Sequence, residues 1–167
     1  MTTEGIDGMA KHLEDWFEKV NRTLDEKPKV KRKFWDIFVD EGRISQFVEQ
    51  RGDFKTEKFT LDTGWDFTRR AHREAFMAKL KKERPEEVWL APPCKLWSSI
   101  NTLNDATKDN AYKQRRRRER DKQKQEFLKF SREIYDEQQR GQRHAHLEHP
   151  RYATSWSEDV WQDMDGY

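Results

Sequence analysis

Short apolar runs alternate with amphipathic helical patterns after residue 33, and this alternation constrains the fold more than any other feature of the chain. A run rich in aromatic and β-branched residues predicts a buried strand at 34–39, and three further short segments, 54–61, 87–91 and 144–148, are also predicted to be strands. Apolar residues at steps of three and four predict helices at 44–50 and 69–83. Strands that alternate with helices are typical of an α/β fold with a mainly parallel sheet flanked by helices.

Two further helical patterns accompany these elements. Apolar residues recur at steps of three and four over residues 6–24 and predict an amphipathic helix. A longer pattern covers 111–140 and ends at Gly141; its first half is nearly all charge, and only its second half has apolar residues to bury. The polar segment 98–110 predicts a loop.

Charge is distributed unevenly along the chain, although the net charge is only +2. Residues 27–33 hold five cations and no acid, and residues 113–124 hold eight cations and two acids. Four consecutive arginines point in all directions around a helix, so a solvated face does not account for all of them. Basic blocks of this kind predict contact with nucleic acid. The residues that we expect to make it are Arg115, Arg116, Arg117, Arg118 and Arg120.

The chain therefore divides into an N-terminal amphipathic helix with a basic linker, residues 1–33, and an α/β domain, residues 34–167, that includes the long basic helix. No apolar run approaches the ~20 residues of a membrane helix, so we expect no membrane partner. The single cysteine excludes an internal disulfide and suits a reducing compartment. We expect an intracellular protein, nuclear or cytoplasmic.

Polar or unusual residues follow all four predicted strands. Ligands of parallel sheets bind beyond the carboxyl ends of the strands, at the switch point of the topology. Four such strand ends together are a stronger signal for a site than any one motif. The segments are Asp40 to Gly42, Asp62 to Asp66, Pro92 to Cys94, and Glu148 to Pro150.

Cys94 and Glu148 form a candidate pair of nucleophile and acid. Two prolines stiffen the turn before Cys94, which suits a thiol that faces an open crevice; a small buried apolar side chain is the alternative. Glu148 either caps neighbouring backbone or acts in acid–base chemistry. Such a pair suits addition of a thiolate to an electron-poor ring, with the acid donating to a ring nitrogen.

Three segments resemble motifs of the DNA cytosine-5 methyltransferases. Residues 36–42 (DIFVDEG) resemble the D-x-F-x-G-x-G turn that wraps S-adenosylmethionine, residues 91–94 (APPC) the Pro-Cys motif, and residues 147–150 (LEHP) the E-N-V motif. The phrases GWDFT, PPCKLWSSINTLN and EHPRYATSW resemble a divergent, methyltransferase-like branch found in retroelement-type polyproteins. The resemblance covers residues 34–160.

This resemblance implies a Rossmann-like domain with strand order 3-2-1-4-5, or a shortened version of it, that binds S-adenosylmethionine. Carried over by position, Cys94 would add to carbon 6 of cytosine, and Glu148 would contact the ring nitrogen and the exocyclic amine. The cofactor would be lined by Phe38, Gly42, Asp62, Asp66 and Pro92.

The chain also departs from the family pattern. Asp40 stands where the first glycine of the family's turn is found, and His149 replaces the asparagine of the E-N-V motif. The sequence ends at Tyr167, before the family's later Q-x-R-x-R strand and target-recognition region, so we expect a shortened domain. Three functions stay open. One is methyl transfer to cytosine in DNA, and another is catalytically inactive binding of nucleic acid, DNA more than RNA, within a transposon or polyprotein. The third is a structural segment of a larger polyprotein with no role of its own.

Two other groups of residues have competing interpretations. His144 and His146 share one face of a strand near His149, so a transition-metal site is conceivable, but the spacing matches no metal motif and we expect no metal. Trp65 and Trp97 flank the expected crevice, where they either stack on a base or pack in the core.

Overall fold

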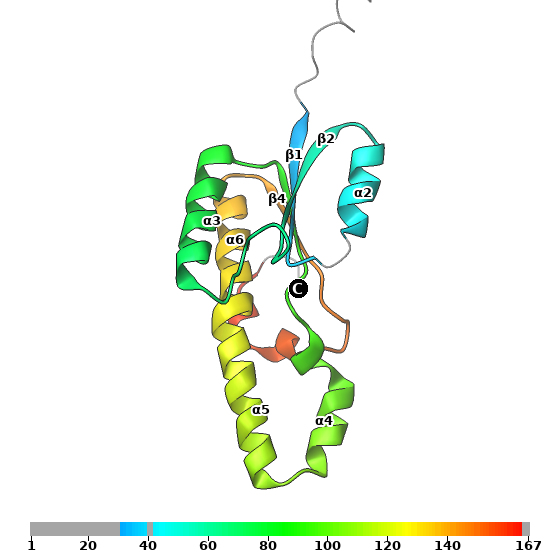
Figure 1. Cartoon of the computed structure of the whole chain (residues 1–167), viewed down its shortest axis with the longest axis vertical. Helices are drawn as coiled ribbons and strands as arrows, with labels where there is room; N and C mark the ends of the chain where they lie inside the picture. Colours follow the sequence, from blue (N-terminus) through cyan, green and yellow to red (C-terminus); the bar gives the residue numbers. More distant parts are fainter. Residues whose placement is uncertain (1–30, 40–41, 165–167) are drawn as a thin grey trace, which may run out of the picture. The chain divides into compact units, whose positions relative to one another are not determined.

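The computed structural model describes residues 31–39 and 42–164, and the chain divides into two units, Met1–Lys31 and Arg32–Tyr167. The helix predicted over 6–24 lies outside the described residues, as do Asp40 and Glu41. No helix in the described part of the chain is long and apolar enough to cross a membrane. The second unit holds every element described below (Figure 1).

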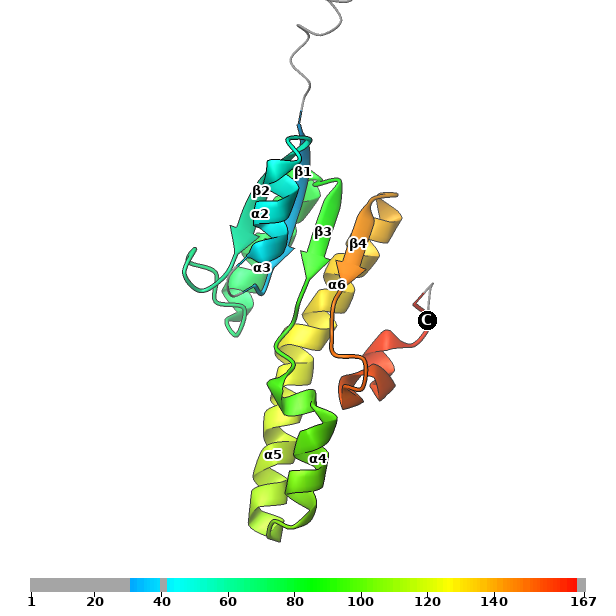
Figure 2. The same ribbon diagram turned by 90° about the vertical axis from the view of Figure 1, so that its right-hand side faces the viewer.

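Four strands form one sheet in which every pair of neighbours is parallel (Figure 2). The order is β2-β1-β3-β4. The predicted mainly parallel sheet is confirmed, and the order of the described strands matches the 2-1-4-5 part of the predicted order. The strands are β1 (Arg32–Ile37), β2 (Phe54–Phe59), β3 (Glu87–Leu90) and β4 (His144–Leu147).

Helices cover both faces of this sheet. Helix α2 (Arg43–Gln50) packs on β1 and β2 from one side, and α3 (Arg70–Glu83) and α6 (Lys129–Arg140) cover the opposite face (Figure 1). Side chains of a strand alternate between the two faces of the sheet, and those on the face that α3 and α6 cover pack with these helices in an aromatic core. The core includes Trp35, Ile37, Phe59, Phe76, Leu80, Val88, Leu90, Phe130 and Ile134.

The helix predicted over 111–140 is confirmed as one continuous helix, but its hydrogen-bonding geometry changes along its length. It begins as α5 (Asn110–Gln123), passes through a π-helical turn (Lys124–Leu128) and continues as α6. The Asp109 side chain caps its start by accepting a hydrogen bond from the Tyr112 amide at 2.7 Å. None of the described residues of α5 is buried, whereas α6 buries Phe130 and Ile134. The charged half thus extends beyond the sheet.

Segment 98–110 is not the loop that its polarity predicts. It contains helix α4 (Ser99–Ala106), which follows a 3₁₀ turn, η1 (Lys95–Trp97). Serine, asparagine, threonine and aspartate form helices weakly by themselves, so tertiary contacts decide the outcome here. The carboxylate of Asp105, near the end of α4, pairs with Arg116 and Arg120 of α5.

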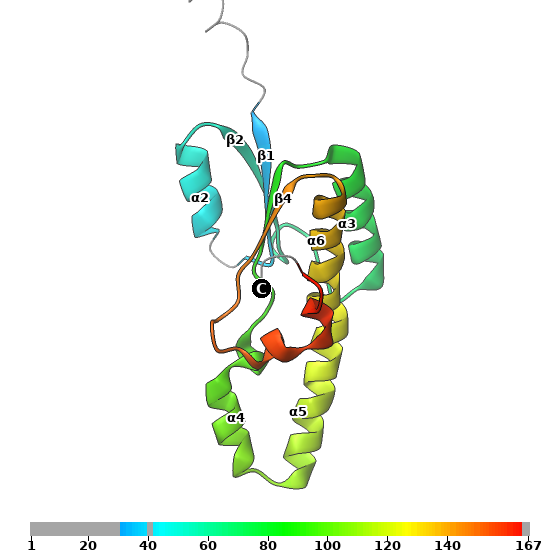
Figure 3. The same cartoon turned by 180° about the vertical axis from the view of Figure 1, so that it is seen from behind.

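Two 3₁₀ turns follow β4 and pack on the long helix, η3 (Thr154–Ser157) and η4 (Asp159–Trp161) (Figure 3). Arg132 of α6 donates to the carbonyl oxygen of Val160 at 3.1 Å, and Lys124 contacts Glu158 and Asp159. A second apolar cluster closes this end of the domain; it comprises Trp97, Leu128, Ala153, Trp161 and Met164.

The first strand begins two residues earlier than predicted. β1 begins at Arg32, inside the segment interpreted as a basic linker. The Lys33 ammonium pairs with Glu83 at 3.2 Å, and the Arg32 guanidinium lies over the ring of Phe54 at 4.1 Å. Two of the five cations of that run therefore belong to the fold.

Candidate functional site

A pocket of about 290 Å³ lies where β1 and β2 end. Pockets that bind small molecules typically measure about 300–1,000 Å³, so this one is at the small end of that range. Its walls come from the segments after β1, β2 and β3 and from the π-helical turn. They are Phe38, Val39, Phe59, Thr60, Leu61, Asp62, Trp65, Asp66, Phe67, Thr68, Pro93 and Phe127. The pocket therefore occupies the edge of the sheet where sequence reasoning expects a ligand.

Phe38 shapes the aromatic wall of this pocket. Its backbone has φ +68°, a left-handed conformation that bulky residues rarely adopt and that costs about 1–3 kcal/mol. The Phe38 amide donates to the carbonyl oxygen of Phe59 at 3.2 Å, which links the ends of β1 and β2. The Phe38 ring then meets Phe67 and Phe127 edge-on, with centroids 5.2 and 5.7 Å apart. Strain of this kind concentrates at functional sites.

Two carboxylates form the polar wall. Asp66 accepts hydrogen bonds from both the amide and the hydroxyl of Thr68, at 3.0 and 2.6 Å. The hydrogen bond from the Thr68 side chain is the main reason why the pKa of Asp66 lies below its usual value. Asp62 is exposed at the rim and accepts no hydrogen bond from the described residues. Asp62 is thus the carboxylate that is free to accept hydrogen bonds from a ligand.

Gly42 and Pro92, which were also expected to line a cofactor, lie outside the walls of this pocket. Gly42 precedes α2 with φ +63°, and a side chain there would strain the backbone and meet Lys58. Pro92 is buried, and the next residue, Pro93, reaches the pocket instead. Three of the five expected cofactor residues, Phe38, Asp62 and Asp66, therefore line one cavity.

Cys94 and Glu148 follow neighbouring strands, as the predicted sheet order requires. The Glu148 amide donates to the carbonyl oxygen of Leu90 at 2.8 Å and so extends the pairing of β4 with β3. Its side chain is exposed. Cys94 is half-buried just before η1, where its carbonyl oxygen accepts from the Trp97 amide at 2.9 Å. Both residues follow strands at the carboxyl end of the sheet, but neither of them lines the pocket.

His149 is a buried imidazole without a partner. It is 8% exposed, and neither ring nitrogen has a hydrogen-bond partner within the described residues. Burial lowers the pKa of His149 to about 4, so the ring is neutral at physiological pH. The rings of His149 and Trp156 meet edge to face, with their centroids 5.7 Å apart. His149 therefore packs in the fold at the position of the asparagine in the family motif.

The other two histidines of this strand point elsewhere. His144 and His146 are exposed, and His146 stacks on Trp89 with centroids 5.5 Å apart. The Nε2 atom of His146 lies 3.6 Å from a carboxylate oxygen of Glu87. Among residues 31–39 and 42–164, no group of three or more histidine, cysteine or acidic side chains is arranged to hold a metal ion.

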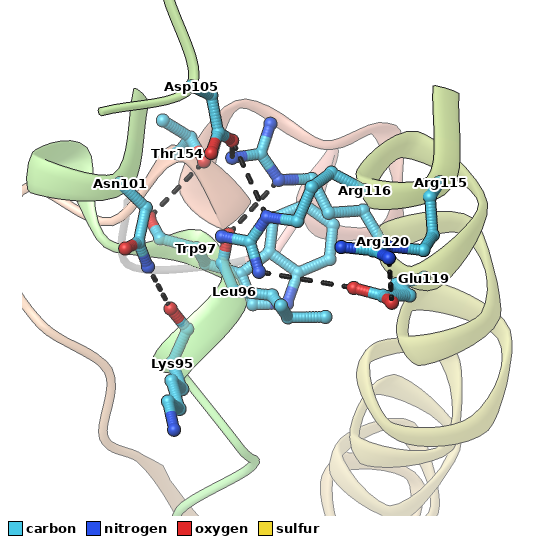
Figure 4. Close-up of polar contacts among 10 residues, drawn as sticks. All are labelled: Lys95, Leu96, Trp97, Asn101, Asp105, Arg115, Arg116, Glu119, Arg120 and Thr154. Atoms are coloured by element: carbon cyan, nitrogen blue, oxygen red, sulfur yellow. Dashed lines mark hydrogen bonds and ion pairs between the residues drawn. The ribbon is translucent and has the colours of Figure 1, made fainter. Parts of the chain in front are cut away.

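The five arginines expected to bind nucleic acid split into two sets on α5. Arg115, Arg117 and Arg118 are exposed. Arg116 and Arg120 face α4, with side chains 13% and 26% exposed, and both pair with Asp105 (Figure 4). The sequence offered no signal for this division, because Asp105 lies in the segment interpreted as a loop.

The two tryptophans also differ. Trp97 is 2% exposed and belongs to the second apolar cluster. Trp65 is half-buried in the pocket wall, where its ring meets Phe59 and Phe76. Phe67 and Phe127 are pocket residues that sequence reasoning missed; Phe127 carried a signal only as an apolar residue of the long helix.

Comparison of the chain with protein-family models, with curated proteins and with solved structures found no match.

Proposed function

We propose that this domain binds S-adenosylmethionine in the pocket at the ends of β1 and β2 and transfers its methyl group to cytosine in DNA. The observation that carries the proposal is the convergence of Phe38, Asp62 and Asp66 on one cavity at the carboxyl edge of a parallel sheet. Aromatic rings suit an adenine, and the free carboxylate of Asp62 suits a ribose hydroxyl. When bound, the cofactor supplies an electrophilic methyl group.

Cys94 and Glu148 supply the groups for the target base. The Cys94 thiolate adds to carbon 6 of cytosine, which makes carbon 5 nucleophilic, and Glu148 donates a hydrogen bond or proton to the ring nitrogen. Carbon 5 would take the methyl group from the sulfonium of the cofactor, which would leave as S-adenosylhomocysteine. Loss of the carbon 5 proton to a base, with elimination of the Cys94 thiolate and return of any proton on the ring nitrogen to Glu148, would then regenerate the aromatic ring. Cytosine in a duplex must leave the stack before this chemistry, and the resembled family uses a separate region for that step.

Cofactor binding is the most direct test. S-adenosylmethionine at 100 times its Kd raises the free energy of unfolding by about 2.7 kcal/mol if it binds only the folded chain. We expect a corresponding rise in melting temperature that Asp62→Ala abolishes. Asp53→Ala is the matched control, because Asp53 is exposed before β2, at the opposite end of that strand from Asp62. A wild-type melting temperature that does not respond to the ligand would refute the assignment.

Covalent trapping tests the chemistry. A 5-fluorocytosine oligonucleotide with S-adenosylmethionine should form an adduct that survives denaturation, because fluorine at carbon 5 does not leave as a proton does. Cys94→Ser should abolish the adduct. Failure of the wild-type chain to form it, although the cofactor binds, would contradict the role of Cys94.

The exposed arginines of α5 support a second function, binding of nucleic acid without catalysis. Each phosphate neutralised on duplex DNA contributes about 0.9 to the slope of log affinity against log salt. If Arg115, Arg117 and Arg118 each contact one phosphate, changing all three to Gln lowers that slope by about 2.7. The variant Arg70→Gln/Lys81→Gln/Lys82→Gln removes the same charge from exposed positions of α3 and is the control. Equal losses in both variants would show that net charge, not α5, governs binding.

A further inference from the structure

Three side chains from three separate segments hold the turn that follows Cys94 (Figure 4). Each donates a hydrogen bond to one of three successive backbone carbonyl oxygens, and the donors come from α4, α5 and the chain after β4. The contacts are Asn101 Nδ2 to Lys95 O, Arg120 Nε to Leu96 O at 3.0 Å, and Thr154 Oγ1 to Trp97 O at 3.2 Å. All three carbonyl oxygens of η1 thus accept side-chain hydrogen bonds, and the candidate nucleophile Cys94 directly precedes this turn.

Arg120 is the central member of this arrangement. Its Nε donates to the turn, while its Nη2 lies 3.3 Å from Oδ2 of Asp105. Arg116 Nε lies 3.5 Å from the same carboxylate oxygen. All three side chains are largely shielded from solvent, where a hydrogen bond that involves a charged group is stronger than one in water. One guanidinium therefore links α4, α5 and the turn after Cys94.

The same helix presents different arginines to solvent. Arg115, Arg117 and Arg118 are exposed and so are available to phosphates, whereas Arg116 and Arg120 have protein partners. Three of the contacts that fix the turn and α4 would break if Arg116 and Arg120 turned outward to a nucleic acid. The structure thus favours a role within the protein for these two residues.

We infer that Arg120 is a positioning residue for Cys94. It holds the backbone of η1 so that the thiol keeps a fixed, half-buried orientation at the carboxyl edge of the sheet. The importance of this orientation for methyl transfer rests on the function proposed above. The orientation itself is a property of the folded chain without any ligand.

Alkylation of Cys94 by iodoacetamide tests this inference, because the chain has no other cysteine. Arg120→Gln removes the charge-assisted hydrogen bond, so we expect local opening of the turn, and with it the alkylation rate, to rise about tenfold. Arg120→Lys keeps a cationic donor and should recover most of the protection. The control Lys122→Gln removes one charge from an exposed position on the same helix and should leave the rate unchanged.

Several outcomes would overturn the inference. One is an alkylation rate in Arg120→Gln equal to that of the wild type. Another is a salt slope for DNA binding that falls by about 0.9 in Arg120→Gln, since that would make Arg120 a phosphate contact. Loss of the folded circular dichroism spectrum in both Arg120 variants would also overturn it, by making Arg120 a residue of overall stability. Faster alkylation in a chain that binds no S-adenosylmethionine would support the positioning role and refute only the proposed function.

Discussion

Replacing His149 by phenylalanine should remove a specific part of the pH dependence of folding. In the folded chain the pKa of His149 is about 4, because burial disfavours the charged imidazole, whereas an exposed histidine has a value of 6.5. Between these two values the unfolded chain binds a proton that the folded chain does not. The free energy of unfolding therefore rises with pH across this window and is lost as pH falls from 6.5 towards 4.

The size of this effect follows from the two pKa values. One pKa unit corresponds to about 1.4 kcal/mol, so His149 accounts for a loss of about 3 kcal/mol between pH 7 and pH 4. Urea unfolding followed by tryptophan fluorescence over that range measures it. We expect the curve for His149→Phe to lack this loss, while His144→Phe, on the exposed face of β4, keeps it. Parallel curves for the wild type and His149→Phe would refute the reasoning.

Three further predictions concern the sheet and its core. Ser45→Ala removes the 2.6 Å hydrogen bond to the buried carboxylate of Asp36 and should lower the free energy of unfolding by about 1.5–3 kcal/mol in urea unfolding at pH 7. An unchanged urea midpoint would contradict this prediction. Burial raises the pKa of Asp36, so its stabilising contribution is complete below the unfolded value of 3.8 and is lost as pH rises through the folded value. Asp36→Asn should therefore gain stability relative to the wild type as pH rises, and a constant difference would count against this. Phe76→Ala leaves a cavity in the aromatic core and should lower the free energy of unfolding, measured by urea unfolding, by about 3–5 kcal/mol. A decrease below about 1 kcal/mol would mean that the core repacks around the smaller side chain.

The sheet was predictable because its strands carry their own signal. The first three contain aromatic and β-branched residues, all four are short runs bounded by charged or turn-forming segments, and the intervening helices have clear apolar periodicity. Helix α4 was not predictable, since its polar residues form a helix only when Asp105 meets the arginines of α5. The π-helical turn was not predictable either, because one extra residue in a long helix does not change the local composition.

The candidate site likewise contains residues that the sequence predicts and residues whose positions depend on contacts between segments. Asp62 and Asp66 were predictable as pocket residues, because they follow a predicted strand and a parallel sheet gathers its strand ends at one edge. Phe38 was expected there only from the resemblance, since it lies inside the predicted strand 34–39. The exclusion of Pro92 in favour of Pro93 depends on the course of one turn. The inward orientation of Arg116 and Arg120 depends on the position of a neighbouring helix. Contacts between segments decide both, and local sequence does not encode them.

The π-helical turn between α5 and α6 sets the rotational phase of the long helix. Each residue of an α-helix advances the side-chain direction by about 100°, and a π-helical turn holds about one residue more than an α-helical turn, so conversion of Lys124–Leu128 to regular α-helical geometry with no residue removed would rotate α5 relative to α6 by about that angle. Phe130 and Ile134 would keep α6 anchored in the core, and Arg120 would turn away from Asp105. A single residue in this turn thus decides which arginines face the protein and which face solvent.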